Sequence, residues 1–413
     1  MEKVITFGCR LNIFESEVIR SSIEKAGAED VIVFNTCSVT QEAERQAIKA
    51  IKRARKEYPD KKIIVTGCAA QINPAKYSAL KEVDLVLGNT EKFKAESYQH
   101  NVETKILISD IMEIKETAAH LVTSFGDKTR AFIQIQNGCN HRCTFCIIPY
   151  GRGNSRSVPI GEIVNQVSIL LGQGYKEIVF TGVDITDYGL DLPGKPSLGE
   201  MIQRLFKLLP NLPRLRLSSI DVAEIDPNLM NLILHEPRLM PHFHISLQSG
   251  DNMILKRMKR RHNREQVIEF CNLVRAHRKD AAFGADIIAG FPTETETMFA
   301  NSLNLVKEAK LQYLHVFPYS EREGTPAARM PQVAIELRKK RTKILIEQGK
   351  KELEEFSKNY IGKTVQVLLE KNNVGIMDNF LKIYIDENVE SNSIVNVNIH
   401  SFIDNKLIGS LIK

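Results

Sequence analysis

The first hundred or so residues alternate short β-branched runs with charged amphipathic stretches, and this alternation constrains the fold more than any other feature. Residues 4–7, 31–35 and 62–66 have the composition of strands. The stretches at 14–26 and about 41–58 have the apolar spacing of helices. Strands that alternate with helices in this way form right-handed βαβ units, so we expect the chain to begin with a parallel sheet.

A cysteine follows each of these three strands. Cys9, Cys37 and Cys68 lie one to three residues beyond the strand ends and are 28 and 31 residues apart, which is one βα unit per step. Positions just beyond the carboxyl ends of parallel strands gather along one edge of a sheet. The three cysteines are therefore expected to converge in space, although any one of them alone could be a small core residue.

A second group of cysteines lies on a single loop. Cys139, Cys143 and Cys146 form a C-x3-C-x2-C motif directly after a predicted strand at 130–136. Structural zinc usually takes four ligands in paired spacings, whereas three thiolates on one loop suit a [4Fe–4S] cluster whose fourth iron is open. The alternative is a zinc site with His141 as the fourth ligand.

A longer series of strands and helices begins at Thr129. Its expected strands lie at 130–136, 177–181, 214–218, 242–246, 282–288 and 314–317. Six repeats are too few for a closed eight-stranded barrel, so we expect a partial (β/α)6 barrel. After an amphipathic helix at 335–360 the chain becomes β-rich, which predicts a small all-β domain. The expected fold class is α/β, with domains at 1–100, 125–355 and 359–413.

The composition excludes two classes of protein. No run approaches the eighteen or so apolar residues of a membrane-spanning helix, and the N-terminus lacks the apolar stretch of a secretion signal. Seven cysteines, an odd number, argue against a disulfide framework and for reduced thiols in the cytoplasm. Cys271, the seventh, lies in an apolar helical stretch and is expected to be a core thiol.

The loop from Cys139 to Cys146 resembles the cluster motif of the radical S-adenosylmethionine superfamily. The contexts Thr6-Phe7-Gly8-Cys9, Asn35-Thr36-Cys37 and Thr66-Gly67-Cys68 resemble the N-terminal domain of the methylthiotransferases, and the likeness extends over nearly the whole chain. This resemblance implies two [4Fe–4S] clusters, one held by each set of three cysteines, and S-adenosylmethionine as cofactor. It also implies a C-terminal TRAM-like domain, which is an RNA-binding module.

Sulfur insertion at an aromatic carbon does not suit acid–base catalysis, because that C–H bond is not acidic enough. The resemblance implies a radical route, in which an electron from the cluster at Cys139, Cys143 and Cys146 cleaves S-adenosylmethionine to a 5′-deoxyadenosyl radical. That radical removes the hydrogen, sulfur at the other cluster attacks the carbon, and a second S-adenosylmethionine supplies the methyl group. No side chain is expected to act as a catalytic acid or base.

Six residues are expected, by the same resemblance, to contact S-adenosylmethionine. They lie in the cysteine loop or at the carboxyl ends of predicted barrel strands, and they are Phe145, Gly182, Asp184, Ser218, Ser246 and Gln248. An aromatic ring can pack on the adenine, a glycine permits close approach of the backbone, and a carboxylate can hold the amino group. Hydroxyl groups and glycines at strand ends are also common caps and turns.

The densest basic run lies at 256–264, where six of nine residues are Lys or Arg. Such runs are usually solvated helix faces, but beside a barrel mouth this one is a candidate for binding phosphates. The expected substrate-binding residues are Arg152, Lys256, Arg257, Arg260 and Arg261. The TRAM-like tail at 364–413 carries four Lys and six acidic residues, so much of the affinity for RNA is expected to come from the barrel.

The substrate is indicated by resemblance alone. The contexts of Cys37 and Cys68 and the stretches at 146–157 and 317–326 most resemble the branch that adds a methylthio group to C2 of N6-threonylcarbamoyladenosine beside the tRNA anticodon. An unpaired loop base can be splayed into a pocket at low unstacking cost. The alternatives are isopentenyladenosine in tRNA, an aspartate of a small-subunit ribosomal protein, and a non-catalytic RNA-binding protein with structural metal.

Expected partners are the tRNA anticodon loop and an electron donor such as a flavodoxin or ferredoxin, whereas the sequence does not indicate the sulfur donor.

Overall fold

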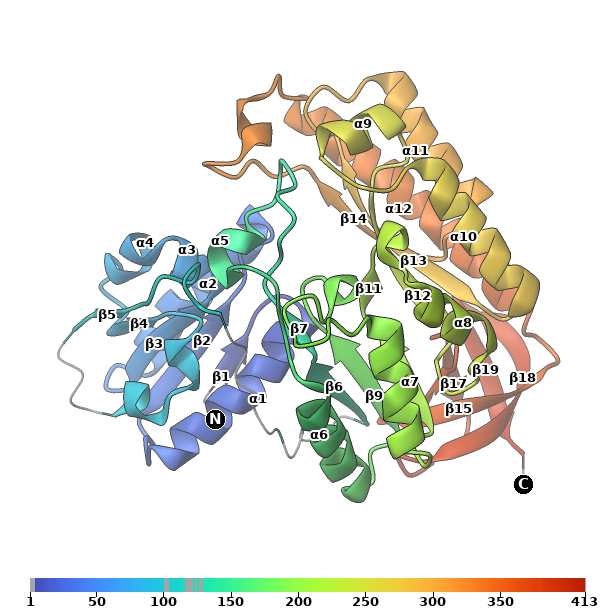
Figure 1. The fold of residues 1–413 in the computed structure, drawn as a ribbon, viewed down its shortest axis with the longest axis horizontal. Coiled ribbons are helices and arrows are strands. Elements are labelled where there is room, and N and C mark those ends of the chain that lie inside the picture. The colour runs from blue at the N-terminus through green and yellow to red at the C-terminus, as the bar shows by residue number, and fades with distance from the viewer. Residues whose placement is uncertain (1–3, 100–103, 116–121, 123–124, 126–128, 413) are drawn as a thin grey trace.

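The computed structural model describes residues 4–99, 104–115, 122, 125 and 129–412. The chain begins with a parallel sheet whose strands are in sequential order (Figure 1). These strands are β1 (Val4–Thr6), β2 (Val31–Thr36), β3 (Lys62–Gly67), β4 (Leu85–Leu87) and β5 (Ile106–Leu107). The helical segments between them are α1 (Arg10–Lys25), α2 (Gln41–Glu57), α3 (Cys68–Ile72), α4 (Pro74–Ser78), η1 (Glu91–Phe93) and η2 (Ala95–Tyr98).

Two details of this sheet differ from the sequence prediction. Helix α1 starts at Arg10, directly after Cys9, and not at residue 14. Strand β5 pairs in parallel with β4 and extends the sheet past residue 100. It is only two residues long, which is too short for a periodic pattern in the sequence, and both residues are exposed.

The middle of the chain forms two parallel sheets that together make a partial barrel. One sheet has the order β10-β9-β6 and the other β11-β12-β13-β14, and no ladder between described residues joins β6 to β14. The strands are β6 (Arg130–Gln134), β9 (Glu177–Thr181), β10 (Arg214–Leu217), β11 (Ser219–Ile220), β12 (His242–Gln248), β13 (Ala282–Ala289) and β14 (Tyr313–Pro318). The expected incomplete barrel is therefore confirmed, with a break at Ser218 where the chain passes from one sheet to the other.

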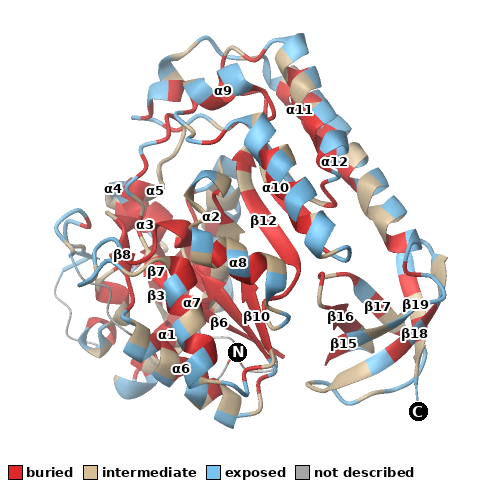
Figure 2. Ribbon diagram, turned by 45° about the vertical axis from the view of Figure 1, so that its right-hand side comes forward, coloured by how far each residue is buried: buried red, intermediate tan, exposed pale blue. Residues whose placement is uncertain are grey.

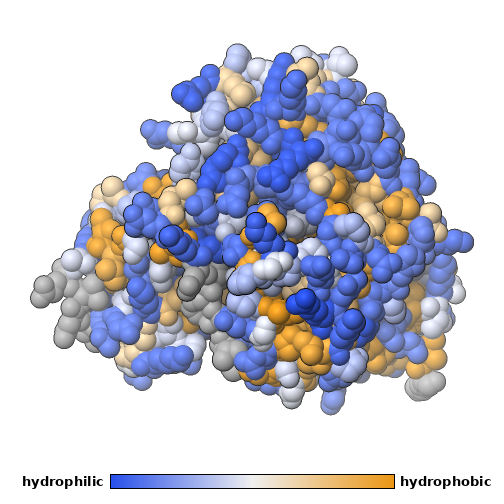
Figure 3. All heavy atoms as spheres, in the orientation of Figure 1, coloured by the Kyte–Doolittle hydropathy of each residue, from blue (hydrophilic) through white to orange (hydrophobic). Residues whose placement is uncertain are grey.

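Helices cover the outside of this barrel (Figure 1). They are α6 (Ile160–Gly172), α7 (Leu198–Leu208), α8 (Pro227–His235), α9 (Asn252–Arg257), α10 (Arg264–His277), α11 (Glu296–Glu308) and α12 (Ile335–Lys358). Figure 2 shows buried strands with helices whose outer faces are exposed, and Figure 3 shows mainly hydrophilic residues on one face of the molecule. None of the described helices combines the length and the apolar character needed to cross a membrane.

The alternation of side chains along β12 separates an outer and an inner face. Phe243, Ile245 and Leu247 belong to the main apolar core, where Phe243 packs edge-on against Phe270 of α10. Successive side chains of a strand point to opposite faces of the sheet. His242 and His244 therefore point toward the inside of the barrel, and this inner face is polar.

The last part of the chain is a closed five-stranded barrel, which confirms the expected all-β region. Its strands, in spatial order, are β15 (Thr364–Glu370), β16 (Val374–Met377), β17 (Lys382–Ile385), β19 (Lys406–Leu411) and β18 (Ile394–Ile403). Phe380, in the turn between β16 and β17, stacks on His242 with ring centroids 4.8 Å apart. The small barrel therefore docks at the amino-terminal end of the large one.

Buried charges fix this docking. Glu177, at the start of β9, accepts hydrogen bonds from Arg216 at 2.8 and 3.1 Å and lies 3.0 Å from Arg214 Nε. Arg216 also donates to the Asp378 carbonyl at 2.9 Å, while Arg214 Nη2 lies 3.1 Å from the Asp378 carboxylate. One carboxylate thus orients two arginines that hold the C-terminal barrel.

We predict that Glu177→Gln destabilises the protein strongly, because it removes the anion that two buried guanidinium groups share and leaves Arg216 without an ion-pair partner. Breaking a buried ion pair in this way costs about 3–5 kcal/mol. The free energy of unfolding, measured by urea denaturation, should fall by that amount. Glu355→Gln on the exposed face of α12 is the matched control and should stay within about 0.5 kcal/mol of the wild type. Equal effects of the two substitutions would contradict the prediction.

Candidate functional site

The three N-terminal cysteines lie together at the carboxyl edge of the first sheet. Cys9 precedes α1, Cys37 follows β2, and Cys68 opens α3 directly after β3. Gly8 has a φ of +98°, and a Cβ at this position would lie 2.7 Å from the sulfur of Cys37. Only glycine lets the loop of Cys9 approach Cys37 this closely.

Charged side chains surround this first triplet. Arg152 donates to Glu15 at 2.7 Å, and Lys92 donates to the other oxygen of the same carboxylate at 2.7 Å. All three side chains are at most 3% exposed. Two cations against one anion leave a net positive charge beside the first triplet, although burial still raises the pKa of the Cys68 thiol.

The second triplet lies on the loop after β6, between the short strands β7 (Gln136–Asn137) and β8 (Arg156–Ser157). Cys139 N donates to the Gly153 carbonyl at 3.1 Å. Gly138 has a φ of +72°, and a Cβ there would lie 1.9 Å from the Asn154 carbonyl oxygen, so the loop closes tightly on itself. Arg260 Nη1 lies 3.5 Å from the sulfur of Cys143, which places a cation beside this triplet as well.

The short helix α5 (Ile148–Arg152) connects the two triplets. It follows Cys146, and a Cβ on its residue Gly151 would lie 3.2 Å from Cys68 Cβ. Cys146 and Gly151 are five residues apart, so their Cα atoms are at most about 18 Å from each other. A single short segment therefore brings the second triplet close to the first.

The thiols of both triplets fit clusters better than a single metal ion. Among the described residues, two groups of possible ligands have all their ligand atoms within 4.8 Å of one another, and neither contains a cysteine. In each cysteine triplet, at least two of the sulfurs are therefore more than 4.8 Å apart. This separation is too wide for one zinc ion bonded at about 2.3 Å to every sulfur. Burial raises the pKa of Cys37 and of Cys146 to about 12, so both are neutral thiols at pH 7 and must lose a proton to bind a metal.

His141 is held by two carboxylates. Its Nε2 lies 3.1 Å from Asp184 Oδ2 and 3.0 Å from Glu224 Oε1. Hydrogen bonds to Asp184 and to Glu224 raise the pKa of His141 to about 10, so the ring is protonated at neutral pH. The ring nitrogen Nε2 is therefore engaged by carboxylates and not by the sulfurs of the second triplet.

The residues expected to contact S-adenosylmethionine share one rim of the barrel. Gly182 and Asp184 directly follow β9, Ser218 follows β10, and Ser246 and Gln248 end β12. Asp184 Oδ2 lies 3.7 Å from the sulfur of Cys139, which ties this rim to the second triplet. Phe145 lies inside the cysteine loop, with its ring 6.4 Å from that of Phe291 in an edge-on arrangement. Their roles toward the cofactor stay predictions.

The predicted substrate-binding cations lie in different environments. Arg152 is 2% exposed and engaged with Glu15, so it is not open to a ligand. Arg257 donates to Thr293 Oγ1 at 2.8 Å, and Arg260 donates to Asp221 at 2.6 Å. Lys256 is exposed, and Arg261 is exposed while paired with Glu224. The surface of the run at 256–264 thus offers fewer free cations than its sequence suggests.

A further cation, which the sequence reading did not single out, lies at the inner face of the barrel. Arg10 follows Cys9, and its guanidinium lies 5.9 Å from the Phe380 ring centroid. The charges of Arg130, Arg216, Glu177 and Asp286 all act on it. No sequence pattern marks this position, because only the folded chain brings α1 to the open side of the barrel.

Asp286 on β13 is held between two histidines. Its Oδ1 lies 3.0 Å from His244 Nε2 and 3.2 Å from His315 Nδ1. The two imidazole rings are 4.6 Å apart. The neighbouring strands β12, β13 and β14 thus contribute one polar group that the sequence reading also missed.

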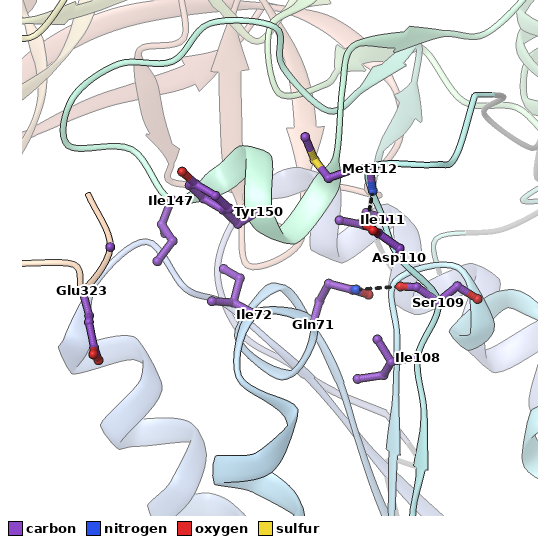
Figure 4. Close-up of a pocket in the computed structure, with 11 residues that line it drawn as sticks. Gln71, Ile72, Ile108, Ser109, Asp110, Ile111, Met112, Ile147, Tyr150 and Glu323 are labelled. Atoms are coloured by element: carbon purple, nitrogen blue, oxygen red, sulfur yellow. Dashed lines mark hydrogen bonds between the residues drawn. The ribbon is translucent and has the colours of Figure 1, made fainter. Parts of the chain in front are cut away.

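A hollow of about 520 Å³ lies beside the helices α3 and α5 (Figure 4). Ile72, Ile108, Ile147 and Tyr150 form much of its apolar lining. Gln71 donates to the Ser109 carbonyl at 3.1 Å and closes one side. None of the six cysteines lines this hollow, so it lies outside the two cysteine sites.

Comparison with known proteins agrees with this arrangement. Residues 133–306 match the model of the radical SAM superfamily, and residues 2–88 match that of the uncharacterized protein family UPF0004. The chain is 60% identical to the threonylcarbamoyladenosine tRNA methylthiotransferase MtaB of Rickettsia prowazekii, over 94% of this chain and 91% of that protein. It is 32% identical to the tRNA-2-methylthio-N(6)-dimethylallyladenosine synthase of Ehrlichia canis, over 88% and 86% of the two chains.

A solved structure shares the fold at much lower sequence identity. It is the radical S-adenosylmethionine methyltransferase TsrM of Kitasatospora setae with cobalamin and a [4Fe–4S] cluster bound. The two chains are 13% identical with a TM-score of 0.53, and the match covers 75% of this chain and 68% of that one. At this identity the likeness shows the fold alone.

We predict that Glu15→Gln lowers stability above about pH 4.5, because it leaves Arg152 and Lys92 buried without their anion. Burial alone would raise the pKa of Glu15, but the two cations outweigh it and lower the pKa to about 2 from an ordinary value of 4.5. A lowered folded-state pKa stabilises the protein above pH 4.5, and this stabilisation is lost as the pH falls toward 2.

The free energy of unfolding at pH 7 should therefore drop by about 3–5 kcal/mol in Glu15→Gln. The difference from the wild type should shrink as the pH falls from 4.5 toward 2. The matched control is Glu24→Gln on the exposed side of the same helix, which should behave like the wild type. A difference that does not depend on pH would contradict the assignment.

Proposed function

The chain belongs to the family of radical S-adenosylmethionine tRNA methylthiotransferases, and from this premise we propose that it adds a methylthio group to C2 of N6-threonylcarbamoyladenosine beside the tRNA anticodon. The observation that carries the proposal is the link between two cysteine triplets through α5, with Gly151 packed against Cys68. An enzyme that inserts sulfur into a C–H bond needs a radical source and a sulfur source within reach of one carbon.

Membership in the family implies S-adenosylmethionine and a [4Fe–4S] cluster, for which Cys139, Cys143 and Cys146 are the ligand set. We propose Cys9, Cys37 and Cys68 as the ligands of a second cluster. When bound, these groups supply a radical that removes hydrogen from an aromatic carbon, and the sulfur that replaces it. Reduced thiols and a tRNA substrate fit a cytoplasmic enzyme that receives electrons from a flavodoxin or ferredoxin.

The protein's own side chains stabilise and shield this chemistry. Arg260 beside Cys143, and Arg152 near Cys9 and Cys68, place positive charge next to ligand sets that become anionic when they hold iron. Cys37, Cys68 and Cys143 are buried, which keeps water away from reactive species. We propose Asp184 and Ser218 on the barrel rim as contacts of S-adenosylmethionine.

Exposed cations near the barrel mouth contact the tRNA backbone. Lys256 and Lys259 are exposed at the end of α9 and just beyond it, and phosphate groups are their natural partners. The small C-terminal barrel carries an excess of acidic residues, so it contributes shape more than charge. The anticodon loop is a suitable target because its unpaired adenosine reaches a recessed site with little unstacking cost.

Nucleoside analysis tests the substrate. Deletion of the gene should remove 2-methylthio-N6-threonylcarbamoyladenosine from digested tRNA and leave N6-threonylcarbamoyladenosine in its place, as measured by mass spectrometry. Complementation with the wild-type chain should restore the product. A strain that keeps the methylthio nucleoside, or that loses a methylthio group from isopentenyladenosine or from a ribosomal-protein aspartate, would refute the assignment.

Cysteine variants test the two clusters separately. Anaerobic reconstitution should yield about eight irons in the wild type and about four in Cys143→Ala and in Cys37→Ala. Cys143→Ala should form no 5′-deoxyadenosine from S-adenosylmethionine, whereas Cys37→Ala should still form it but make no methylthio product. Cys271→Ala, which removes a buried thiol from the core, is the control and should keep both clusters. About four irons in the wild type would refute the second cluster.

A further inference from the structure

Arg10 is a recessed cation without a counter-ion. Among the described residues, no hydrogen bond or ion pair to its guanidinium is formed, and its nearest defined contact is the ring of Phe380 at 5.9 Å. A charge withdrawn from water in this way is costly unless an anion reaches it. We therefore expect an anionic group from outside the chain to bind at Arg10.

The anions around Arg10 already have other partners. Glu177 is held by Arg214 and Arg216. Asp286 accepts hydrogen bonds from His244 and His315. The charges of these two carboxylates thus stabilise the protonated form of Arg10, but neither carboxylate forms an ion pair with it.

Several polar atoms on the same inner face also lack a partner within the described chain. They are Gln134 Oε1, both ring nitrogens of His242, and the hydroxyl of Tyr313. His242 feels the charge of Arg10, which places the two groups near each other. Buried polar groups are nearly always satisfied in a working protein, so these unpartnered atoms point to a polar ligand or to water that a ligand displaces.

The position of Arg10 along the chain links it to the reaction. It directly follows Cys9, which we propose as a ligand of the sulfur-bearing cluster, and its side chain extends toward residues of β6, β9, β10 and β13. An adenine whose C2 meets the sulfur has its N6 substituent on the neighbouring part of the same ring. The Arg10 guanidinium lies toward the amino-terminal end of the barrel, beside Phe380, so an N6 substituent that extends inward from the rim runs toward it.

We propose that Arg10 binds the carboxylate of the N6-threonylcarbamoyl group and thereby selects this nucleoside over adenosines with an apolar N6 substituent. The inference rests on the proposed function. A guanidinium binds a carboxylate through two parallel hydrogen bonds, and a substrate without the carboxylate leaves the cation recessed and unpaired. The enzyme thus discriminates in two ways. The substrate with the carboxylate gains hydrogen bonds to Arg10, and a substrate without it leaves Arg10 recessed and unpaired.

The test is a double-substitution cycle with the reconstituted full-length enzyme. One axis compares the wild type with Arg10→Gln, and the other compares tRNA carrying the threonylcarbamoyl carboxylate with tRNA in which that carboxylate has been converted to an amide. Either single change should lower kcat/KM for methylthiolation by about 100-fold, and the double change should cause little further loss. Arg10→Lys should lie between the wild type and Arg10→Gln.

Two controls separate substrate binding from other roles of Arg10. S-adenosylmethionine affinity and 5′-deoxyadenosine formation without tRNA should stay within about twofold of the wild type in Arg10→Gln, whereas their loss would assign Arg10 to the cofactor carboxylate and overturn the proposal. Arg20→Gln, a substitution on the same helix at an arginine paired with Glu17, should leave kcat/KM for both tRNAs unchanged.

The outcomes distinguish this inference from the function on which it rests. If the wild type does not modify the carboxylate tRNA at all, the proposed function fails and the inference fails with it. If the wild type modifies both tRNAs equally well, only the inference fails, and this comparison does not depend on any variant that folds poorly. Additive losses in the cycle would likewise overturn it, because they would show that Arg10 contacts a phosphate or supports the fold.

Discussion

The ion pair between Glu15 and Arg152 is the interaction on which the site depends. Glu15 lies on α1, which carries Cys9 at its start, and Arg152 lies on α5, which follows Cys146. The 2.7 Å contact therefore joins the element that carries the first triplet to the element that carries the second. Because both side chains are buried, the pair fixes the mutual position of two parts of the chain that a solvent-exposed contact would leave loose.

An apolar contact at the same place would join these elements at lower desolvation cost, yet the chain uses charges. With Lys92 the group carries a net positive charge beside Cys9 and Cys68. A ligand set of thiolates becomes anionic when it holds iron, so under the proposed second cluster the residues that orient the two elements also stabilise the loaded state. The buried group of Glu15, Lys92 and Arg152 thus has a structural and a chemical role. Both roles require Arg152 to lie among ion pairs and not in an open cleft.

The sequence predicted those features of the fold that come from a repeated pattern. It did not predict contacts between single residues that are far apart in the chain. The period of the βα units predicted that Cys9, Cys37 and Cys68 meet at one sheet edge, because strand spacing alone determines that edge. The partial barrel and the small all-β region followed from the same kind of pattern. The pairing of Arg152 with Glu15, 137 residues apart, has no periodic signal. The short strand β5 and the position of Arg10 were missed for the same reason.

The inner face of the barrel shows how an open barrel can serve recognition. In a closed barrel the lumen is packed with side chains from its own strands, and no group from outside can enter. Here β6 and β14 are not joined in the described chain, and α1 packs near β6 with Arg10 at its start. The N-terminal domain therefore places one cation, Arg10, at the barrel interior, directly after Cys9 of the first triplet. Under the roles proposed for Cys9 and Arg10, which are consecutive residues, the position of the sulfur source and the choice of nucleoside cannot shift independently.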